Sequence, residues 1–284
     1  MGSPHPFHPS RHIHAIDHAP LQASLMRIAA ISVRHLVVLL RSWPRLVESV
    51  YMPTATLMQW VIFKNYLSAK SLPTLGSTLL VSYLMWEIIF RFKQGTVMSL
   101  FTEMWGRALP QLFTTPLTPL EMMFGCFIVG LVRAVLGIGI AVAVALGAGW
   151  SDYIELRGSV LVVTVFALMS SAAVSLIMSG VILRWGIAAE ILSWALVLTL
   201  APLSGVLYPT SALPLGLQWV SALLPTTYVF DCVRELLATG AIMDGTLTMV
   251  AATASAWLAI GLTLFLAMFE NTRKSGLLDG GPVD

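Results

Sequence analysis

Four charged side chains interrupt two long apolar stretches of the sequence. Glu87, Arg91 and Lys93 fall in one stretch and Arg133 falls in the next. A charge in the middle of a membrane helix is costly and usually functional. Glu87 and Arg91 are four residues apart, so on a helix they share a face and can form an ion pair. The set either contacts an anionic substrate group such as a phosphate, or fixes helix packing within one chain. A proton relay is a third interpretation.

Patterns that would support hydrolysis or nucleotide binding are missing from the sequence. There is no GxxxxGK[ST] loop to hold ATP phosphates and no HExxH motif. Outside the first 20 residues the only histidine is His35, so a Ser/His/Asp set cannot be assembled. We therefore expect no catalytic residue, no metal site and no cofactor in this chain.

The composition also argues against a soluble enzyme. Hydrophobic residues make up 57% of the 284 residues and charged residues only 11%, whereas soluble domains carry about 25% charged residues. A net charge of +2 is too balanced for a phosphate-binding surface, so nucleic acid is not an expected partner. These values exclude a soluble enzyme and a disordered protein, and they predict a polytopic membrane protein.

Six stretches are long and apolar enough to cross a hydrocarbon core of about 30 Å. They run over residues 46–66, 77–100, 120–148, 158–183, 187–208 and 246–269. The segment before them, 23–43, carries Arg27, Arg34 and Arg41 at seven-residue intervals among apolar residues. This pattern favours an amphipathic helix in the membrane interface over a seventh span.

The ends of the chain and the positive charges give an orientation. Residues 1–22 are expected to form a flexible cytosolic tail, and residues 276–284 a second cytosolic tail. Lysines and arginines near the span ends are more numerous on the N-terminal side than on the opposite side. The sequence therefore predicts that both termini are cytosolic.

Two connections differ from simple loops. Residues 101–119 mix polar and apolar residues and predict a short helix that docks on a cytosolic partner, with Glu103 and Arg107 four residues apart as polar contacts. Residues 204–240 hold apolar runs of about ten residues between prolines. Runs of that length do not span a bilayer, so they predict two short re-entrant or interfacial helices.

Aromatic side chains on the first two spans either line a path for an apolar substrate or pack against helices and lipid. They are Tyr51, Trp60, Tyr83, Trp86 and Phe90.

The last long connection carries a recognisable pattern. An SG-x-x-[FY]-P run is followed by LP and then by a P-[LT]-[TA]-[YH] run with Asp and Arg after it. The matching residues are Ser204, Gly205, Tyr208, Pro209, Leu213, Pro214, Pro225, Thr227, Tyr228, Asp231 and Arg234. Together with the WGR…LFTTPLTPLE segment of residues 105–121, this pattern resembles that of ABC-2 type exporter permeases. The resemblance covers about residues 22–275.

The resemblance implies an all-α integral membrane domain over residues 23–275, like that of type V ABC exporters. Its parts would be six transmembrane helices, an N-terminal interfacial helix and two short re-entrant helices between helices five and six. Such permeases pair, usually as homodimers, in a bacterial inner membrane. They bind two copies of a separate ABC ATPase, which holds ATP and magnesium. Their substrates are amphipathic: lipid-linked glycans, polysaccharides, lipids or drugs.

The resemblance also implies roles for particular residues. Coupling to the ATPase would use Glu103, Trp105, Arg107 and Pro110. The extracytoplasmic exit would be shaped by Ser204, Gly205, Tyr208, Pro209, Pro214, Pro225, Asp231 and Arg234. A substrate path along the five aromatic residues and Glu87, Arg91 and Lys93 is suggested by the residue types themselves and not by the family pattern. The competing interpretation is an ion-coupled secondary transporter or channel, which the intramembrane charges alone support.

Overall fold

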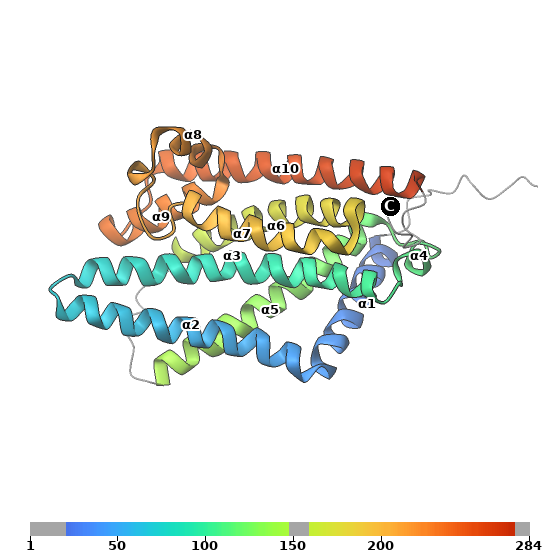
Figure 1. The fold of residues 1–284 in the computed structure, drawn as a ribbon, viewed down its shortest axis with the longest axis horizontal. Helices are drawn as coiled ribbons and strands as arrows, with labels where there is room; N and C mark the ends of the chain where they lie inside the picture. Colours follow the sequence, from blue (N-terminus) through green and yellow to red (C-terminus); the bar gives the residue numbers. More distant parts are fainter. Residues whose placement is uncertain (1–20, 148–158, 276–284) are drawn as a thin grey trace, which may run out of the picture.

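The computed structural model describes residues 21–147 and 159–275, and these residues form helices and turns without a β-strand. Figure 1 shows the long helices lying side by side. In chain order the elements are α1 (Leu21–Arg41), α2 (Trp43–Ala69), α3 (Pro73–Trp105), α4 (Leu109–Leu112), α5 (Pro119–Gly147), α6 (Ser159–Trp185), η2 (Gly186–Ala189), α7 (Glu190–Leu203), η3 (Thr210–Ala212), α8 (Leu215–Leu223), α9 (Pro225–Thr239) and α10 (Asp244–Lys274).

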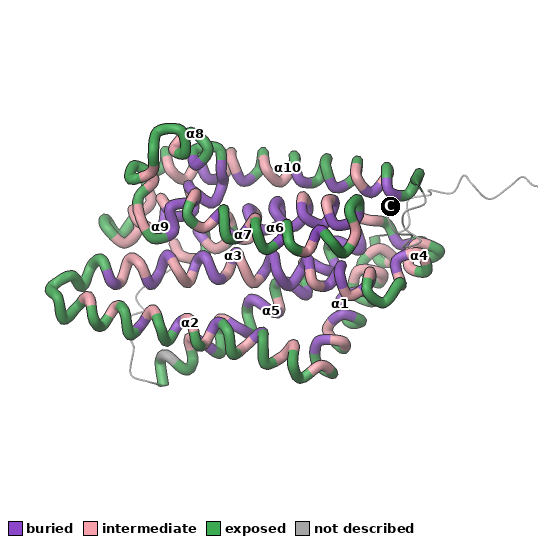
Figure 2. Tube along the Cα trace, viewed as in Figure 1, coloured by how far each residue is buried: buried purple, intermediate pink, exposed green. Residues whose placement is uncertain are grey.

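Helix α3 lies at the centre of the bundle, where it contacts α2, α5, α6 and α9. Figure 2 shows that buried positions are dense along α3 and α6, whereas much of α2 and α8 is exposed. Small residues allow the closest approach: a Cβ atom added at Gly130 of α5 would lie 2.6 Å from the Phe92 carbonyl oxygen of α3. The same holds for Gly261 of α10, where a Cβ would lie 2.7 Å from the Ala173 carbonyl oxygen of α6.

The two ends of the bundle hold different elements (Figure 1). We call one the α1 end, because α1 begins there and because α4 and the last residues of α3 and α10 lie beside it. We call the other the α9 end, where α8, α9 and the start of α10 lie near the turn between α2 and α3. The start of α1 and the end of α10 are therefore on the same side of the bundle.

Five stretches of the described residues are long and apolar enough to cross a membrane, so the protein is a multi-pass membrane protein. They are Leu21–Arg41, Pro73–Trp105, Pro119–Val144, Ser159–Leu203 and Asp244–Lys274. The 45-residue stretch holds α6, η2 and α7, which sequence analysis counts as two spans. Helix α2 is not among the five, although it is 27 residues long, because Glu48, Gln59, Lys64 and Asn65 lower its hydropathy. The count of six spans therefore stays a prediction.

Several expected boundaries shift. Helix α3 has 33 residues and continues to Trp105, beyond the expected end at 100. Helix α7 has 14 residues and ends at Leu203, so it is about 21 Å long and shorter than the expected span 187–208. The expected connection 204–240 does hold two short helices, α8 and α9. Their re-entrant position stays a prediction. Most of the two expected tails lies outside the described residues.

Helix α1 matches the expected segment 23–43 in position, but two of its three regularly spaced arginines form contacts that the sequence did not predict. Arg27 and Arg34 donate hydrogen bonds to Glu121 of α5 and Glu103 of α3. Two of the three arginines thus face partners inside the protein. Helix α1 also meets the length and hydropathy criterion for a span, so its interfacial position stays a prediction.

Candidate functional site

The charged segment of α3 forms a local network. The Arg91 Nε atom donates to Glu87 Oε1 over 2.6 Å, and the Tyr83 hydroxyl donates to Glu87 Oε2 over 3.2 Å. Glu87 is 5% exposed, so the ion pair keeps this carboxylate from being buried without a partner. The ion pair predicted between Glu87 and Arg91 is confirmed.

Lys93 lies on another face of α3 and is among the most deeply buried side chains of the described chain. Its Nζ atom donates to the Ser193 carbonyl oxygen over 2.8 Å. Ser193 is on α7, which packs against few other elements. The ammonium group therefore holds α7 against α3.

The expected path aromatics do not line one surface. The ring centroids of Trp60 and Tyr83 are 5.0 Å apart, which joins α2 to α3. Trp86 lies 6.4 Å from Phe230 of α9. The other two expected aromatic residues also lie apart from this group and from each other. Phe90 lies 5.9 Å from Trp194 of α7, and Tyr51 is 62% exposed on α2. Four of the five rings contribute to different helix contacts and Tyr51 is exposed, so a substrate path through them stays a prediction.

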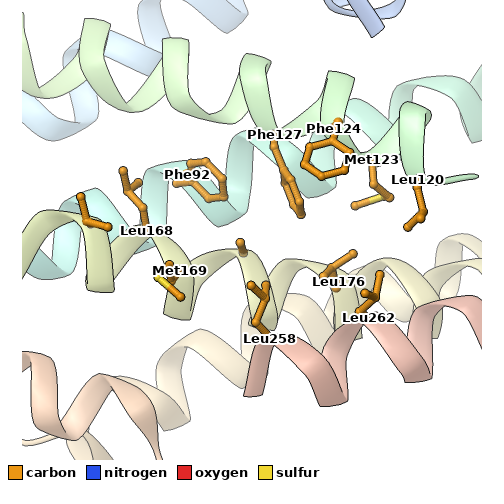
Figure 3. A pocket seen from close by; sticks show the side chains of 12 residues that line it. Phe92, Leu120, Met123, Phe124, Phe127, Leu168, Met169, Leu176, Leu258 and Leu262 are labelled. Atoms are coloured by element: carbon orange, nitrogen blue, oxygen red, sulfur yellow. The ribbon is translucent and has the colours of Figure 1, made fainter. Parts of the chain in front are cut away.

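An apolar groove that sequence analysis did not predict lies between α5, α6 and α10. Its volume is about 390 Å³, within the usual range for small-molecule sites. Figure 3 shows Phe127, Leu168 and Leu258 pointing into it from these three helices, with Phe92 of α3 at its floor. The lining residues are apolar and recur at helical spacing within each helix. Other apolar faces of these helices have the same pattern, so the sequence did not distinguish this set.

At the α9 end, the residues of the recognised pattern come together. Ser204 and Thr226 share a short hydrogen bond between their hydroxyl oxygens. Gly205 has a φ of +66°, a conformation that glycine adopts without steric cost. Arg234 of α9 donates to the Gly205 carbonyl oxygen over 2.6 Å and to Asp231 over 2.6 Å. Arg234 therefore fixes the turn after α7 to α9.

Tyr208 and the three prolines of the pattern shape the chain between α7 and α9. The Tyr208 hydroxyl donates to the Pro202 carbonyl oxygen over 3.0 Å. The three expected prolines stand at helix starts: Pro209 and Pro214 are the N-cap residues of η3 and α8, and Pro225 is the first residue of α9. Proline suits such positions because its φ is preset and its missing N–H has no helical acceptor there.

The structure places some of the residues expected to contact an ATPase on the surface and buries another. Helix α3 ends at Trp105 and Arg107 has a φ of +49°, so Glu103 and Arg107 do not share a helix face as expected. Trp105 and Arg107 are exposed, and Pro110 lies in the four-residue helix α4. Glu103 is 2% exposed. Its carboxylate is not available on the surface.

Glu103 contacts α1 instead. Its Oε2 atom accepts a hydrogen bond of 2.8 Å from Arg34, and its Oε1 atom lies 3.5 Å from His35 Nε2. Glu121 of α5 holds α1 in the same manner, because it accepts hydrogen bonds from Arg27 and from the Ser24 hydroxyl. Glu121 also caps α5 by accepting from the Thr118 N–H over 2.9 Å. The sequence signal for that cap is the T-x-x-E spacing before an apolar run.

These features define a multi-pass helical membrane protein whose polar residues join helices at both ends of the bundle. A comparison with protein families narrows the class: the family described as ABC-2 family transporter protein matches residues 47–269. The chain belongs to this family and is a transport membrane subunit of an ABC transporter. No curated protein matches the chain.

Proposed function

We propose that the protein is the permease subunit of an ATP-driven exporter in a bacterial inner membrane. It moves an amphipathic substrate, such as a lipid-linked glycan, polysaccharide, lipid or drug, out of the cytoplasm. The family match over residues 47–269 carries this proposal. Family membership implies an ABC ATPase partner, and ATP and magnesium bind to that partner. Two permeases and two ATPases form the working unit.

The α1 end supplies a surface for the ATPase. Trp105 is 43% exposed, and Arg107 is exposed in the turn before α4. Directly behind this turn, Glu103 is held by Arg34 of α1. A push on the α3–α4 turn would therefore reach α1 as well as α3, which is the coupling that an exporter needs.

The unpartnered apolar faces of α2 and α7 support a homodimer. Ile191 and Leu198 of α7 are 76% and 74% exposed, and Ile62 of α2 is 62% exposed. A second copy of the chain would cover these faces and would enclose a path between two protomers. The groove between α5, α6 and α10 is a second apolar surface, suited to an acyl or polyprenyl chain.

The test is co-expression with a candidate ABC ATPase, sought among the reading frames that neighbour the gene of this chain, followed by purification in nanodiscs. We expect a complex of two permeases and two ATPases that hydrolyses ATP. Trp105→Ala and Arg107→Ala should each reduce recovery of the ATPase. Trp219→Ala is the matched control, since Trp219 is 77% exposed on α8 at the other end of the bundle. If no ATPase binds and neither variant has an effect, the ion-coupled alternative replaces the exporter.

A further inference from the structure

Arg133 is a buried cation that lacks a partner of its own. It lies midway along α5 and is 8% exposed. Its Nε atom is buried without a hydrogen bond, and no carboxylate of the described residues forms an ion pair with it. Arg91 and Lys93 differ in this respect, because Arg91 is bonded to Glu87 and Lys93 to the Ser193 carbonyl. Arg133 is thus the guanidinium that remains available to a ligand.

Two close helix contacts place Arg133 beside other arginines. A Cβ atom added at Gly95 would lie 3.0 Å from Arg133 Cδ, so the Arg133 side chain runs over Gly95 of α3. Arg91 is one turn before Gly95 and lies on the same face of α3. On the other side, a Cβ atom at Gly137 would lie 2.5 Å from the Ser49 carbonyl oxygen of α2.

The Gly137–Ser49 contact also fixes the neighbour of Arg133 on α2. One helical turn before Gly137 is Arg133, and one turn before Ser49 is Arg45. Helices α2 and α5 start from the same end of the bundle (Figure 1), so these two residues lie at one level. Arg133 therefore lies between the two other arginines along α3. Arg91 is one turn from Gly95 on one side, and on the other side Arg45 donates a hydrogen bond of 3.3 Å to the Thr102 hydroxyl.

The charges in this cluster do not cancel. Arg133 is within electrostatic reach of Arg45, Arg91 and Glu48. Glu48 is exposed on α2 and Glu87 is already bonded to Arg91. Three guanidinium groups thus face two carboxylates, which leaves one positive charge at a buried position. A membrane protein retains such a charge at a cost, and a functional ligand is the usual reason.

We propose that Arg133 binds the phosphate or phosphodiester group of the exported amphiphile where α2, α3 and α5 meet, with Arg45 and Arg91 as flanking positive charges. This inference rests on the proposed export function and adds the substrate class, a phosphate-bearing lipid or lipid-linked glycan. A guanidinium group suits the task, because its planar fork binds two phosphate oxygens at once and keeps its charge when buried. The sequence also suggested Lys93 as a residue of the substrate path, but its Nζ atom already donates a hydrogen bond to the Ser193 carbonyl oxygen of α7.

The first experiment measures lipid binding to the purified permease in detergent, without the ATPase. The probes are fluorescent phosphatidic acid and the matching fluorescent diacylglycerol, which lacks the phosphate. We expect the permease to bind phosphatidic acid about tenfold or more tightly than diacylglycerol. Arg133→Gln should remove this preference and Arg133→Lys should retain part of it. Arg184→Gln, at an exposed arginine at the end of α6, should leave the preference unchanged.

Gel filtration of each variant separates loss of binding from loss of folding. If Arg133→Gln does not elute as a folded protein, Arg45→Gln is the second variant, since Arg45 is half-buried near the start of α2, and we expect a several-fold weaker preference. A folded Arg133→Gln protein that still prefers phosphatidic acid would overturn the proposal. So would a wild-type permease without any preference.

The second experiment distinguishes a substrate from a resident lipid. In nanodiscs of phosphatidylcholine containing the permease–ATPase complex, phosphatidic acid should stimulate ATP hydrolysis by the wild type and not by Arg133→Gln. If phosphatidic acid binds through Arg133 but leaves hydrolysis unchanged, the group belongs to a resident lipid and the substrate assignment is wrong. If no ATPase binds while the phosphate preference stands, the exporter proposal fails and the phosphate site remains.

Discussion

The two ends of the bundle are fixed by polar contacts of different kinds. At the α1 end, carboxylates of α3 and α5 accept hydrogen bonds from arginines of α1, so charged side chains meet charged side chains. At the α9 end, polar side chains terminate on backbone carbonyl groups: Arg234 on Gly205, Tyr208 on Pro202, and Trp257 on Leu223. Both arrangements join separate elements. The first joins them through two side chains, whereas the second joins a side chain to the backbone of a turn or a helix end.

This difference has a physical consequence for each end. A contact between two charges can be broken and reformed while both helices keep their shape, which suits an end that receives motion from an ATPase. A side chain bonded to a backbone carbonyl holds a turn in one conformation. The α1 end should therefore respond mainly to changes in charge, and the α9 end mainly to changes in shape.

The largest effect should come from a shape change at the α9 end. Gly205→Ala places a side chain at a φ of +66°, with its Cβ 2.9 Å from the Tyr208 carbonyl oxygen and from Thr210 Cγ2. We expect a loss of about 3 kcal/mol in the free energy of unfolding. Thermal unfolding of the purified protein in detergent measures it.

Gly216→Ala is the matched control for this change. Gly216 lies in α8 at the same end, and no atom lies within 4 Å of an added Cβ. This variant should unfold at the wild-type temperature or slightly above it, because alanine favours a helix. Equal destabilisation by both alanines would show that the turn at Gly205 has no special shape requirement.

The next effect should come from a charge change at the α1 end. Arg34→Ala leaves the Glu103 carboxylate 3% exposed without its cation, which should cost about 2 kcal/mol. In the double variant Arg34→Ala/Glu103→Gln the buried charge is gone, so the loss should fall to about 1 kcal/mol. Unfolding curves of Arg34→Ala, Glu103→Gln and the double variant test this. Additive losses would contradict a direct bond between the two side chains.

A smaller effect is expected for Trp257→Phe. The Trp257 Nε1 atom donates to the Leu223 carbonyl oxygen over 2.7 Å and ties α10 to the end of α8. Phenylalanine keeps the apolar contact and removes one hydrogen bond, so the loss should be about 1 kcal/mol. Trp219→Phe is the control, with 77% of the side chain exposed, and should leave the unfolding temperature unchanged.

The smallest effect is expected at an exposed charge pair. Glu270 lies 3.0 Å from Arg273 and 3.5 Å from Lys274, with 39% of its side chain exposed. Glu270→Ala should change stability by less than about 0.5 kcal/mol. This variant is the exposed reference for the buried pair at the α1 end. If Glu270→Ala lost as much stability as Arg34→Ala, burial of the Glu103 carboxylate would not be the cause of the larger effect.

Contacts within one helix could be predicted from the sequence. Glu87 and Arg91 are four residues apart and form the expected ion pair. Asp231 and Arg234 are three apart, a spacing that allows a local pair. Arg234 forms this pair and also donates to the Gly205 carbonyl oxygen. In each case the helical period alone brings the two side chains together.

Contacts between distant helices could not be predicted in this way. Glu103 was matched with Arg107 by spacing, yet its partner Arg34 is 69 residues away. A single backbone feature decided the outcome, because α3 stops at Trp105 and Arg107 turns out of the helix. The groove lined by Phe92, Phe127 and Leu258 depends likewise on how three helices diverge, which no local pattern records.

The bond between Lys93 and Ser193 bears on how the protein is made. The two residues are 100 positions apart in the chain, and synthesis proceeds at about 5–20 residues per second. For about 5–20 s after Lys93 is added, the carbonyl that will accept its hydrogen bond does not yet exist. Helix α3 must therefore wait at the membrane with an unmatched ammonium group until α7 is added. Its final position is set late in biogenesis, by a segment translated long after it.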